Sequence, residues 1–286
     1  MKANYAKFKR QRNVYMLKSP GSTALEIGSL NIYWYGIIIA LAFVCGFIIT
    51  VSIAAKTYPD KETKDHIIDL STILLITGIV SARLYYVLFN LNYYKENPLE
   101  VFMLWQGGLS IHGVIIGCLL VMYLYTKIHK LSMLKYTDLF AFGLIFAQAI
   151  GRWGNFFNSE AFGTPTDLPW KLYIPPENRP PEYINFEYFH PAFLYESLWN
   201  LLLFFIFTVF LQKYIRQKPG IITFSYFVLY SLGRFFIEGI RLDNIYSVMG
   251  LHLAQFICIV MLVIGIVGLY IIISKNNNNK ITSQTR

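Results

Sequence analysis

Charged side chains are scarce in this sequence. Only 14% of its 286 residues are Asp, Glu, Lys or Arg, whereas a soluble domain carries roughly 25%. Apolar residues make up 55% of the chain, and they gather in runs of about 20 residues, long enough to cross a bilayer as helices. The scarcity of charge argues against a soluble enzyme, and the apolar runs indicate an integral membrane protein.

Cysteine is also rare. Cys45, Cys118 and Cys258 lie far apart in apolar runs, without Cys-x-x-Cys or Cys/His spacing, and we expect them to be small packing residues. The sequence lacks a phosphate-cradling glycine loop, a zinc triad and a carboxylate cage for magnesium, so we expect a site without metal or cofactor. The net charge of +9 suits an anionic lipid surface, and no nucleic-acid-binding module accompanies it.

The apolar runs predict an all-α integral membrane protein with seven transmembrane helices. Their approximate bounds are residues 32–55, 67–90, 108–127, 137–157, 193–213, 221–241 and 250–274. Together they form one domain over residues 26–275, whose longest connection, 158–190, is rich in proline and acidic residues. We expect a basic tail at 1–25, either disordered or upstream of the true start, and a polar cytoplasmic tail at 276–286 to flank this domain.

The lysines and arginines of the short loops predict the orientation of the chain. With the N-terminus outside, the inner loops and the C-terminal tail hold Lys56, Lys61, Lys64, Lys127, Lys130, Lys135, Lys213, Arg216, Lys218, Lys275, Lys280 and Arg286. The outer loops after the first span then hold only Lys95, Lys171, Arg179 and Arg241. This asymmetry favours an outer N-terminus and a cytoplasmic C-terminus. The basic stretch "MKANYAKFKRQR" argues against it, and a translation start at Met16 would remove that stretch.

Six of the seven spans bring polar side chains to the same, outer side. These side chains are Tyr35, Arg83, His112, Arg152, Asn155, Asn158, His190, Tyr195, Glu196, Arg234, Glu238 and Arg241. Ionisable residues within spans usually face the protein interior or a wet cavity. We therefore expect a polar cavity open to the outer leaflet, in which arginines bind an anionic group such as a phospholipid phosphate.

Several of these residues also have a structural interpretation. Arg234, Glu238 and Arg241 share one helical face, so they fit an ion-pair set as well as an anion site. Arg83 fits a side chain that extends to the membrane interface, and His190 fits an ordinary loop residue. The glycines that fit close packing between helices are Gly107, Gly108, Gly113 and Gly117.

Four stretches combine glycine with polar residues. They are "GGLSIHGVIIG" (107–117), "GRWGNFFNSEAFG" (151–163), "HPAFLYE" (190–196) and "GRFFIEGIR" (233–241). Two further stretches, "WYG" (34–36) and "ARLYYVLF" (82–89), belong to the same pattern. In this order, they closely resemble the motifs of the bacterial prolipoprotein diacylglyceryl transferase family, and the resemblance extends from about residue 25 to about residue 275.

This resemblance implies a seven-span enzyme of the bacterial cytoplasmic (inner) membrane, with its active site facing the outer leaflet. The implied reaction moves the diacylglyceryl group of phosphatidylglycerol to the lipobox cysteine thiol of a prolipoprotein signal peptide, which forms a thioether and releases glycerol 1-phosphate. It is the first step of lipoprotein maturation, and the membrane lipid itself is the cosubstrate. The alternatives are a secondary transporter or an anion-binding membrane scaffold, although the chain shows no internal repeat of the kind common in transporters.

The resemblance also implies roles for individual residues. His112 is the implied base, and Arg152 and Arg234 are implied to bind the phosphodiester and stabilise developing charge. We expect Glu160 and Glu238 to hold these arginines. A strongly positive cavity that itself favours the thiolate would leave His112 only a positioning role. The implied substrate-binding residues are Tyr35, Asn155, Glu160, Gly163, Tyr230, Glu238 and Arg241.

Two places depart from the family pattern. Val114 stands where the family usually has a second glycine after the histidine. Ala192 and Phe193 stand where it usually has serine and glutamine. The second departure argues against a direct polar role at residues 192 and 193, and both leave the other motif residues in place.

Overall fold

The computed structural model describes residues 16–28, 30–242, 247–248 and 250–284, so most of the expected basic tail lies outside the described residues. Seven described helices are long and apolar enough to span a membrane, which confirms the predicted number and order of spans. They are α2 (Trp34–Thr57), α3 (Lys61–Phe89), α5 (Ile111–Ile128), α6 (Met133–Phe157), α7 (Ala192–Ile206) with the turns that continue it to Tyr214, α8 (Ile221–Glu238) and α9 (Leu253–Gln284), which spans as far as Ser274.

The ends of these helices differ from the predicted ends where the terminal turns are polar. Helix α3 begins at Lys61 rather than near residue 67, because Asp60 caps it: the Thr63 backbone N–H donates to Asp60 Oδ1 at 2.6 Å. Hydrogen bonds from Thr63 hold the pKa of the Asp60 carboxyl below its ordinary value. Helix α9 continues to Gln284 and therefore includes most of the segment 276–286 that was expected to be a tail.

The chain divides into two compact units, residues 1–49 with 140–286 and residues 50–139. In the second unit, α3 packs along α5. A Cβ at Gly113 would lie 2.3 Å from the Ser81 carbonyl oxygen, and one at Gly117 would lie 2.4 Å from Ser81 Oγ. These glycines therefore allow close helix packing, as their spacing predicted. Between the two spans lie α4 (Leu91–Glu96) and the 3-10 helices η1 (Pro98–Phe102) and η2 (Leu104–Gln106).

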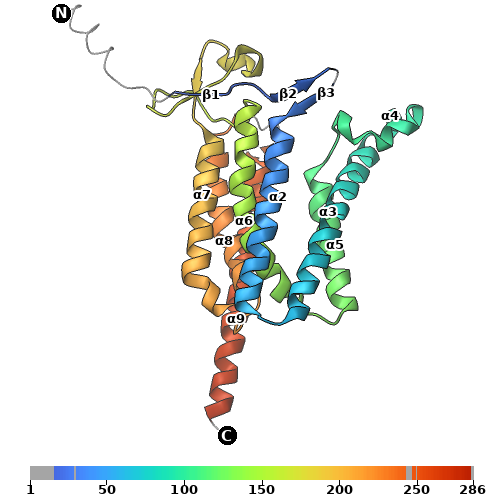
Figure 1. Ribbon diagram of the computed structural model, residues 1–286. Coiled ribbons are helices and arrows are strands. Elements are labelled where there is room, and N and C mark those ends of the chain that lie inside the picture. Colours follow the sequence, from blue (N-terminus) through green and yellow to red (C-terminus); the bar gives the residue numbers. More distant parts are fainter. Residues whose placement is uncertain (1–15, 29, 243–246, 249, 285–286) are drawn as a thin grey trace, which may run out of the picture. The chain divides into compact units, whose positions relative to one another are not determined.

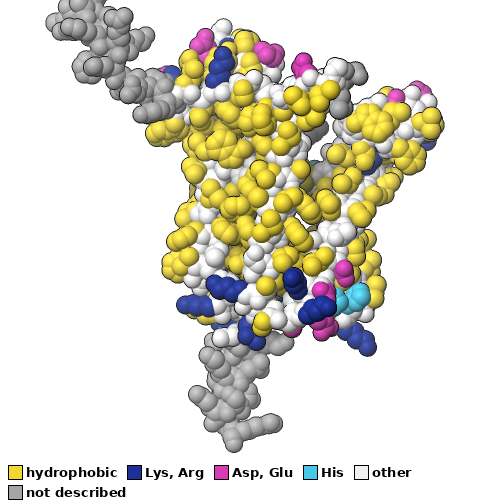
Figure 2. Space-filling model, viewed as in Figure 1, with side chains coloured by type: hydrophobic (Ala, Val, Ile, Leu, Met, Phe, Trp, Pro, Cys, Tyr) yellow, Lys and Arg dark blue, Asp and Glu magenta, His cyan; other side chains and the backbone are white. Residues whose placement is uncertain are grey.

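The first unit contains most of α2 and α6 together with α7, α8 and α9, and α8 packs along α9. Its short strands lie at the end of these helices that is far from the C-terminus of α9 (Figure 1). Hydrophobic side chains cover the sides of the helices (Figure 2), as expected for a surface that faces lipid.

The strands of the first unit were not predicted from the sequence. Strand β1 (Leu17–Lys18) pairs in parallel with β4 (Leu172–Tyr173), which pairs antiparallel with β5 (Tyr188–Phe189). Strands β2 (Thr23–Ile27) and β3 (Leu30–Tyr33) form a hairpin before α2, and β6 (Ser247–Val248) pairs with β7 (Leu251–His252) before α9. Regular structure thus begins inside the segment 1–25 that was expected to be a tail.

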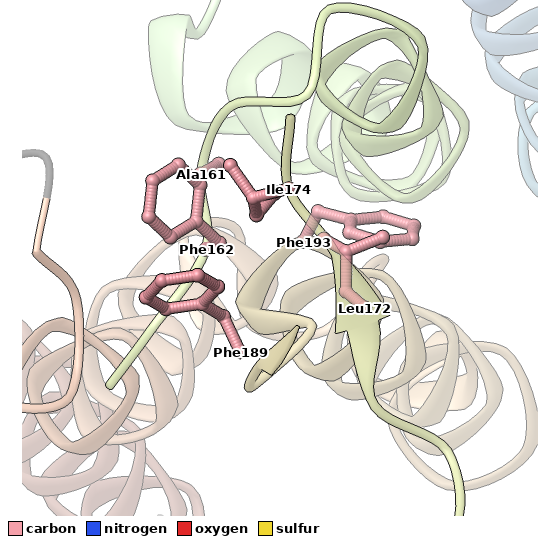
Figure 3. Packing of buried hydrophobic residues seen from close by; sticks show 6 residues of the cluster. All are labelled: Ala161, Phe162, Leu172, Ile174, Phe189 and Phe193. Carbon is pink, nitrogen blue, oxygen red and sulfur yellow. The ribbon is translucent and has the colours of Figure 1, made fainter. Parts of the chain in front are cut away.

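A small hydrophobic core fixes residues 158–191 to the start of α7. Its members are Ala161, Phe162, Leu172, Ile174, Phe189 and Phe193 (Figure 3). Each is at most 3% exposed, and burial of this much apolar surface is the main favourable term in holding such a segment in place. The connection that contains η3 (Pro176–Asn178) and η4 (Pro181–Tyr183) is therefore an ordered part of the fold.

Candidate active site

Three arginines and two glutamates form a buried cluster at one end of the first unit. Arg152 lies near the C-terminal end of α6, and Glu196 lies just over one turn into α7. Arg234 and Glu238 lie in the last turns of α8, and Arg241 follows them. Helices α6 and α8 thus end, and α7 begins, at the same cluster, so three helix termini position its charges.

Glu196 is the centre of this cluster. Its Oε2 lies 2.6 Å from Arg152 Nη2, and its Oε1 accepts hydrogen bonds from Arg234 Nη1 and, at 3.1 Å, from Arg241 Nη1. Its side chain is only 3% exposed. A carboxylate this deeply buried requires charged partners, because removing an isolated charge from water is very costly. One carboxylate therefore aligns three guanidinium groups.

Glu238 is the second acidic member. Its Oε2 lies 2.5 Å from Arg234 Nη2 and 3.9 Å from Arg241 Nη1, and its side chain is fully buried. His252 Nδ1 lies 3.2 Å from the Glu238 carbonyl oxygen. The ion-pair interpretation of Arg234, Glu238 and Arg241 is therefore correct as geometry. Among the described residues, three guanidinium groups thus face two carboxylates in this cluster.

Arg152 is the arginine of the cluster most open to a ligand. Its side chain is 22% exposed, against 13% for Arg234 and 10% for Arg241. Within the described part of the chain, Glu196 is the only group that its guanidinium binds. Its remaining N–H donors are therefore available to an anion, and their planar arrangement suits two oxygens of a phosphate.

The end of α6 continues into a second polar group. Glu160 Oε1 accepts hydrogen bonds from Asn155 Nδ2 at 2.8 Å and from Asn158 Nδ2 at 3.3 Å. Among the described residues, Glu160 binds two amides and forms no ion pair with an arginine, which corrects the expectation from the sequence. The reason is the backbone: Ser159 (φ 53°) and Ala161 (φ 55°) are left-handed, so the chain turns back and returns Glu160 to the end of its own helix.

An open cavity of about 850 Å³ lies beside Glu160. Tyr35, Gly36 and Asn158 also line it, together with apolar side chains from β3 and the start of α2. The ring of Tyr35 packs directly on α6 at Gly154, where a Cβ would lie 2.8 Å from the ring. Tyr35 thus lies against α6 and lines the same cavity as Glu160.

Gly163 fixes the chain that leads away from α6. Its N–H donates to the His190 carbonyl oxygen at 2.8 Å, and its backbone pairs with that of Arg241. A Cβ at this position would lie 3.0 Å from His190 Cβ and 3.0 Å from the Ile240 carbonyl oxygen. The lack of a side chain at Gly163 therefore lets this backbone pass close to His190 and Ile240.

His190 belongs to a short chain of polar contacts rather than to an ordinary loop. Its Nδ1 lies 3.1 Å from Tyr195 Oη, which in turn accepts a hydrogen bond from Trp170 Nε1 at 3.0 Å. Burial lowers the pKa of His190 below its ordinary value. The neutral imidazole is thus the form that suits this position.

Tyr230 lies one turn before Arg234 in α8. Its ring stacks on that of Tyr226, with centroids 5.1 Å apart and an interplanar angle of 20°. Gln148 Nε2 of α6 donates to Tyr226 Oη at 2.9 Å. The two tyrosines thus continue the polar interior of the first unit below the arginine cluster.

His112 and Arg83 belong to the second unit. His112 Nδ1 lies 3.5 Å from Ser110 Oγ, and its ring stacks with that of Tyr85 at 5.9 Å. Arg83 does not extend to the interface as expected: it is 5% exposed, and its guanidinium binds main-chain carbonyl groups. Among the described residues, no group of three or more His, Cys, Asp or Glu is arranged to hold a metal ion.

Comparison with known proteins decides the family. Residues 22–271 match the family model of prolipoprotein diacylglyceryl transferase. The chain belongs to this family. It is 46% identical over 254 residues to the phosphatidylglycerol–prolipoprotein diacylglyceryl transferase of Thermosynechococcus vestitus, covering 88% of this chain and 92% of the relative. The chain is also similar to proteins of the same name from two other organisms. It is 47% identical over 252 residues to that of Acaryochloris marina, covering 88% of this chain and 90% of the relative. It is 44% identical over 249 residues to that of Thermotoga maritima, covering 86% and 83%.

Packing accommodates both departures from the pattern of the prolipoprotein diacylglyceryl transferases. Val114 faces Gly78 of α3 without crowding, since even a Cβ at Gly78 would lie an ordinary 3.5 Å from Val114 Cγ1. Ala192 and Phe193 are both fully buried. Their surroundings agree with the expectation that neither has a direct polar role.

Glu196 was not among the expected site residues, although it stood among the polar residues of the spans. A signal was present: α7 contains no Lys or Arg, so this carboxylate has no charged partner on its own helix. Because a buried charge requires one, its partners had to come from other helices. Which helices supply them depends on the tertiary fold.

Proposed function

We propose that this member of the family transfers the diacylglyceryl group of phosphatidylglycerol to the lipobox cysteine thiol of a prolipoprotein. The products are a thioether on the cysteine and glycerol 1-phosphate. The observation that carries the proposal is the buried cluster in which Glu196 aligns three arginines, of which Arg152 is the most exposed. Such a cluster fits the phosphodiester of an anionic lipid, and the names of the relatives state both substrates.

In the proposed reaction, the thiolate sulfur attacks the glyceryl carbon that carries the phosphodiester oxygen. A carbon–sulfur bond forms and the carbon–oxygen bond breaks, while its electron pair stays on the departing phosphate. Arg152 and Arg234 bind the non-bridging oxygens and stabilise this charge as it develops. Because this stabilisation increases toward the transition state, it raises the rate as well as the affinity.

The thiol proton requires an acceptor, because a free cysteine has a pKa of about 8.5. We assign this role to His112, because histidine is the side chain that most often acts as a general base in enzymes. If His112 is the base, the His112→Gln variant loses turnover at neutral pH by about 10²–10⁴-fold. Its turnover should recover as the pH approaches the pKa of the free cysteine thiol, because the thiolate then forms without a base. Full turnover of this variant at neutral pH would assign His112 a positioning role instead.

The remaining motif residues suit the rest of the lipid. The cavity beside Tyr35 and Glu160 offers hydroxyl, amide and carboxylate groups to the head group of phosphatidylglycerol. A second, apolar cavity of about 480 Å³ lies between α7 and α8, lined by Leu198, Trp199 and Phe236 among others, and its dimensions and chemistry suit an acyl chain. The lipid is the only cosubstrate in this proposal.

We further propose a bacterial inner-membrane location with the site at the outer leaflet and the C-terminus in the cytoplasm. The cluster lies at the end of α7 and α8 that adjoins residues 158–191. The opposite end, between α7 and α8, contains Lys213, Arg216 and Lys218, and lysine and arginine side chains gather there (Figure 2). Basic residues favour the cytoplasmic side, so the cluster is left at the outer side.

The direct test uses the purified full-length protein in liposomes that contain phosphatidylglycerol and a lipobox peptide. Mass spectrometry then measures diacylglyceryl addition to the peptide cysteine. We expect addition with the native protein and none with Arg234→Ala or with a peptide in which serine replaces the cysteine. Lipid binding without any addition by the native protein would contradict the proposal and favour an anion-binding scaffold or a transporter.

A further inference from the structure

The connection between α3 and α5, residues 90–110, exposes large apolar side chains outside the membrane spans. Leu99, Phe102 and Trp105 are 74%, 76% and 79% exposed. Apolar exposure within a span is explained by surrounding lipid, but the flanking spans end at Phe89 and begin at Ile111. Exposed apolar side chains that gather outside the spans mark an interaction surface.

These side chains follow a regular arrangement. Leu99 and Phe102 belong to η1, where three residues make one turn, so they lie on the same face. Trp105 follows three residues later, in η2. The charged residues Lys95 and Glu96 are confined to α4 and are also exposed. The third charged residue, Glu100, lies in η1 between Leu99 and Phe102, where its Oε2 accepts a hydrogen bond from Tyr93 Oη at 2.6 Å.

A single buried arginine holds the backbone of this connection. Arg83 Nε donates to the Val101 carbonyl oxygen at 2.9 Å, and Nη1 donates to those of Gly107 at 2.6 Å and Gly108 at 3.2 Å. Nη2 donates to the Glu100 carbonyl oxygen. Within the described residues, every hydrogen-bond partner of this guanidinium is a main-chain carbonyl, so its five N–H donors serve the backbone of the connection.

Two glycines let the chain close over this guanidinium. Gly107 and Gly108 have φ of 84° and 71°, which L side chains rarely adopt. A Cβ at Gly108 would also lie 2.5 Å from Arg83 Nη1. The connection can therefore approach the arginine this closely only with glycine at that position.

Hydrogen bonds from a protein side chain to main-chain carbonyl groups matter more at a membrane than in water. In water, a loop of this kind hydrogen-bonds to solvent and needs no buried arginine. In lipid, water is absent, so the carbonyl groups of a non-helical segment must find partners in the protein. Arg83 supplies such partners on the side of the connection opposite to solvent or lipid.

We propose that residues 90–110 insert the face formed by Leu99, Phe102 and Trp105 into the bilayer interface, with Arg83 as the internal clamp. The partner is a lipid surface. Because the connection joins the ends of two spans, it already lies at the level of that surface, and tryptophan is enriched there. This inference uses only the second unit and does not depend on the proposed reaction.

Site-directed spin labelling of the full-length protein in phosphatidylcholine–phosphatidylglycerol vesicles tests the insertion. Cys45, Cys118 and Cys258 are replaced by alanine, and a nitroxide is attached at Phe102→Cys or, as the matched control, at Glu96→Cys. We expect the ratio of collisions with oxygen to collisions with a nickel chelate to be several-fold higher at 102. Equal ratios at the two positions would overturn the insertion. Shielding of the label at 102 from both oxygen and the nickel chelate would also overturn it, because it would indicate a protein partner instead of lipid.

The role of Arg83 has a separate readout. In Arg83→Gln, and in Arg83→Lys, which keeps the charge but loses the planar fork, we expect the ratio at 102 to fall toward that at 96. An unchanged ratio in either folded variant would overturn the clamp. The comparison of positions 102 and 96 involves no change at Arg83, so it tests the insertion even if these variants fold poorly.

Discussion

At the scale of single residues, Glu196 contributes both to the stability of the fold and to the arrangement of the arginines in the proposed site. It neutralises part of the charge on Arg152, Arg234 and Arg241 and also fixes where their remaining donors point. Removing one partner of a buried ion pair is far more damaging than removing an exposed one, because the other charge stays buried and unbalanced. The effects of changes at Glu196 and at an exposed glutamate should therefore differ sharply.

We expect Glu196→Gln to lower the free energy of unfolding by about 3–5 kcal/mol and to abolish transfer, because three guanidinium groups lose their shared counter-ion. Thermal unfolding in detergent and mass spectrometry of a lipobox peptide measure the two effects. Glu62→Gln is the control, since that side chain is 81% exposed and its replacement should leave both unchanged. Wild-type stability and transfer in Glu196→Gln would contradict the central role of Glu196.

His190 predicts a dependence of stability on pH. Burial lowers its pKa in the folded state, so the folded protein binds fewer protons at this site than the unfolded chain. The contribution to stability is therefore complete above the unfolded pKa of about 6.5 and is lost as the pH falls from there toward the folded pKa. Unfolding curves from pH 5 to pH 8 measure the slope. In His190→Asn this part of the slope should vanish; an identical slope would assign it to other groups.

The residues of the site show what the sequence can and cannot predict. Arg152, Arg234 and Glu238 were identifiable because charges within apolar spans demand a polar interior. The partners of Glu160 were not, because they depend on left-handed backbone at Ser159 and Ala161, which sequence patterns do not reveal. The place of Glu196 at the centre depends on which helices meet, and only the fold determines that.

At the scale of elements, the spans were predictable and the short strands were not. A span presents about 20 apolar residues to a hydropathy window, whereas β1, β4 and β5 have two residues each and show no alternation. Polar first turns also escape such a window, which is why the start of α3 was placed too late. The core around Phe193 was missed for a related reason, since its members come from short pieces of chain.

The contact between α3 and α5 gives an element-scale prediction. We expect Gly113→Ala to lower the free energy of unfolding by about 1–3 kcal/mol, because its Cβ would lie 2.3 Å from the rigid Ser81 carbonyl oxygen. Gly78→Ala in the same helix pair is the matched control, since its Cβ would meet Val114 at an ordinary 3.5 Å. Chemical unfolding in detergent measures both, and equal losses would contradict the proposed tight contact.

At the scale of the whole molecule, the proposed orientation predicts which loops reagents reach from outside the cell. Asp167 is fully exposed in the 158–191 connection, and Gln217 is exposed between α7 and α8. In a protein without its native cysteines, a membrane-impermeant maleimide should label Asp167→Cys in intact spheroplasts. It should label Gln217→Cys only after permeabilisation. The reverse pattern would invert the topology and move the arginine cluster to the cytoplasmic side.

Because Glu196 is the counter-ion of arginines on other helices, the order in which the helices are synthesised affects their insertion into the membrane. Ribosomes complete α6 before α7 and α7 before α8, so Arg152 reaches the membrane before Glu196 exists, and Glu196 arrives before Arg234. A lone charge costs free energy to insert, up to about 2.5–3.5 kcal/mol at the middle of a helix and less toward its ends, and each of these helices carries at least one. We therefore expect α6 to remain beside the insertion machinery until α7 and α8 join it, so that the three helices enter the lipid together.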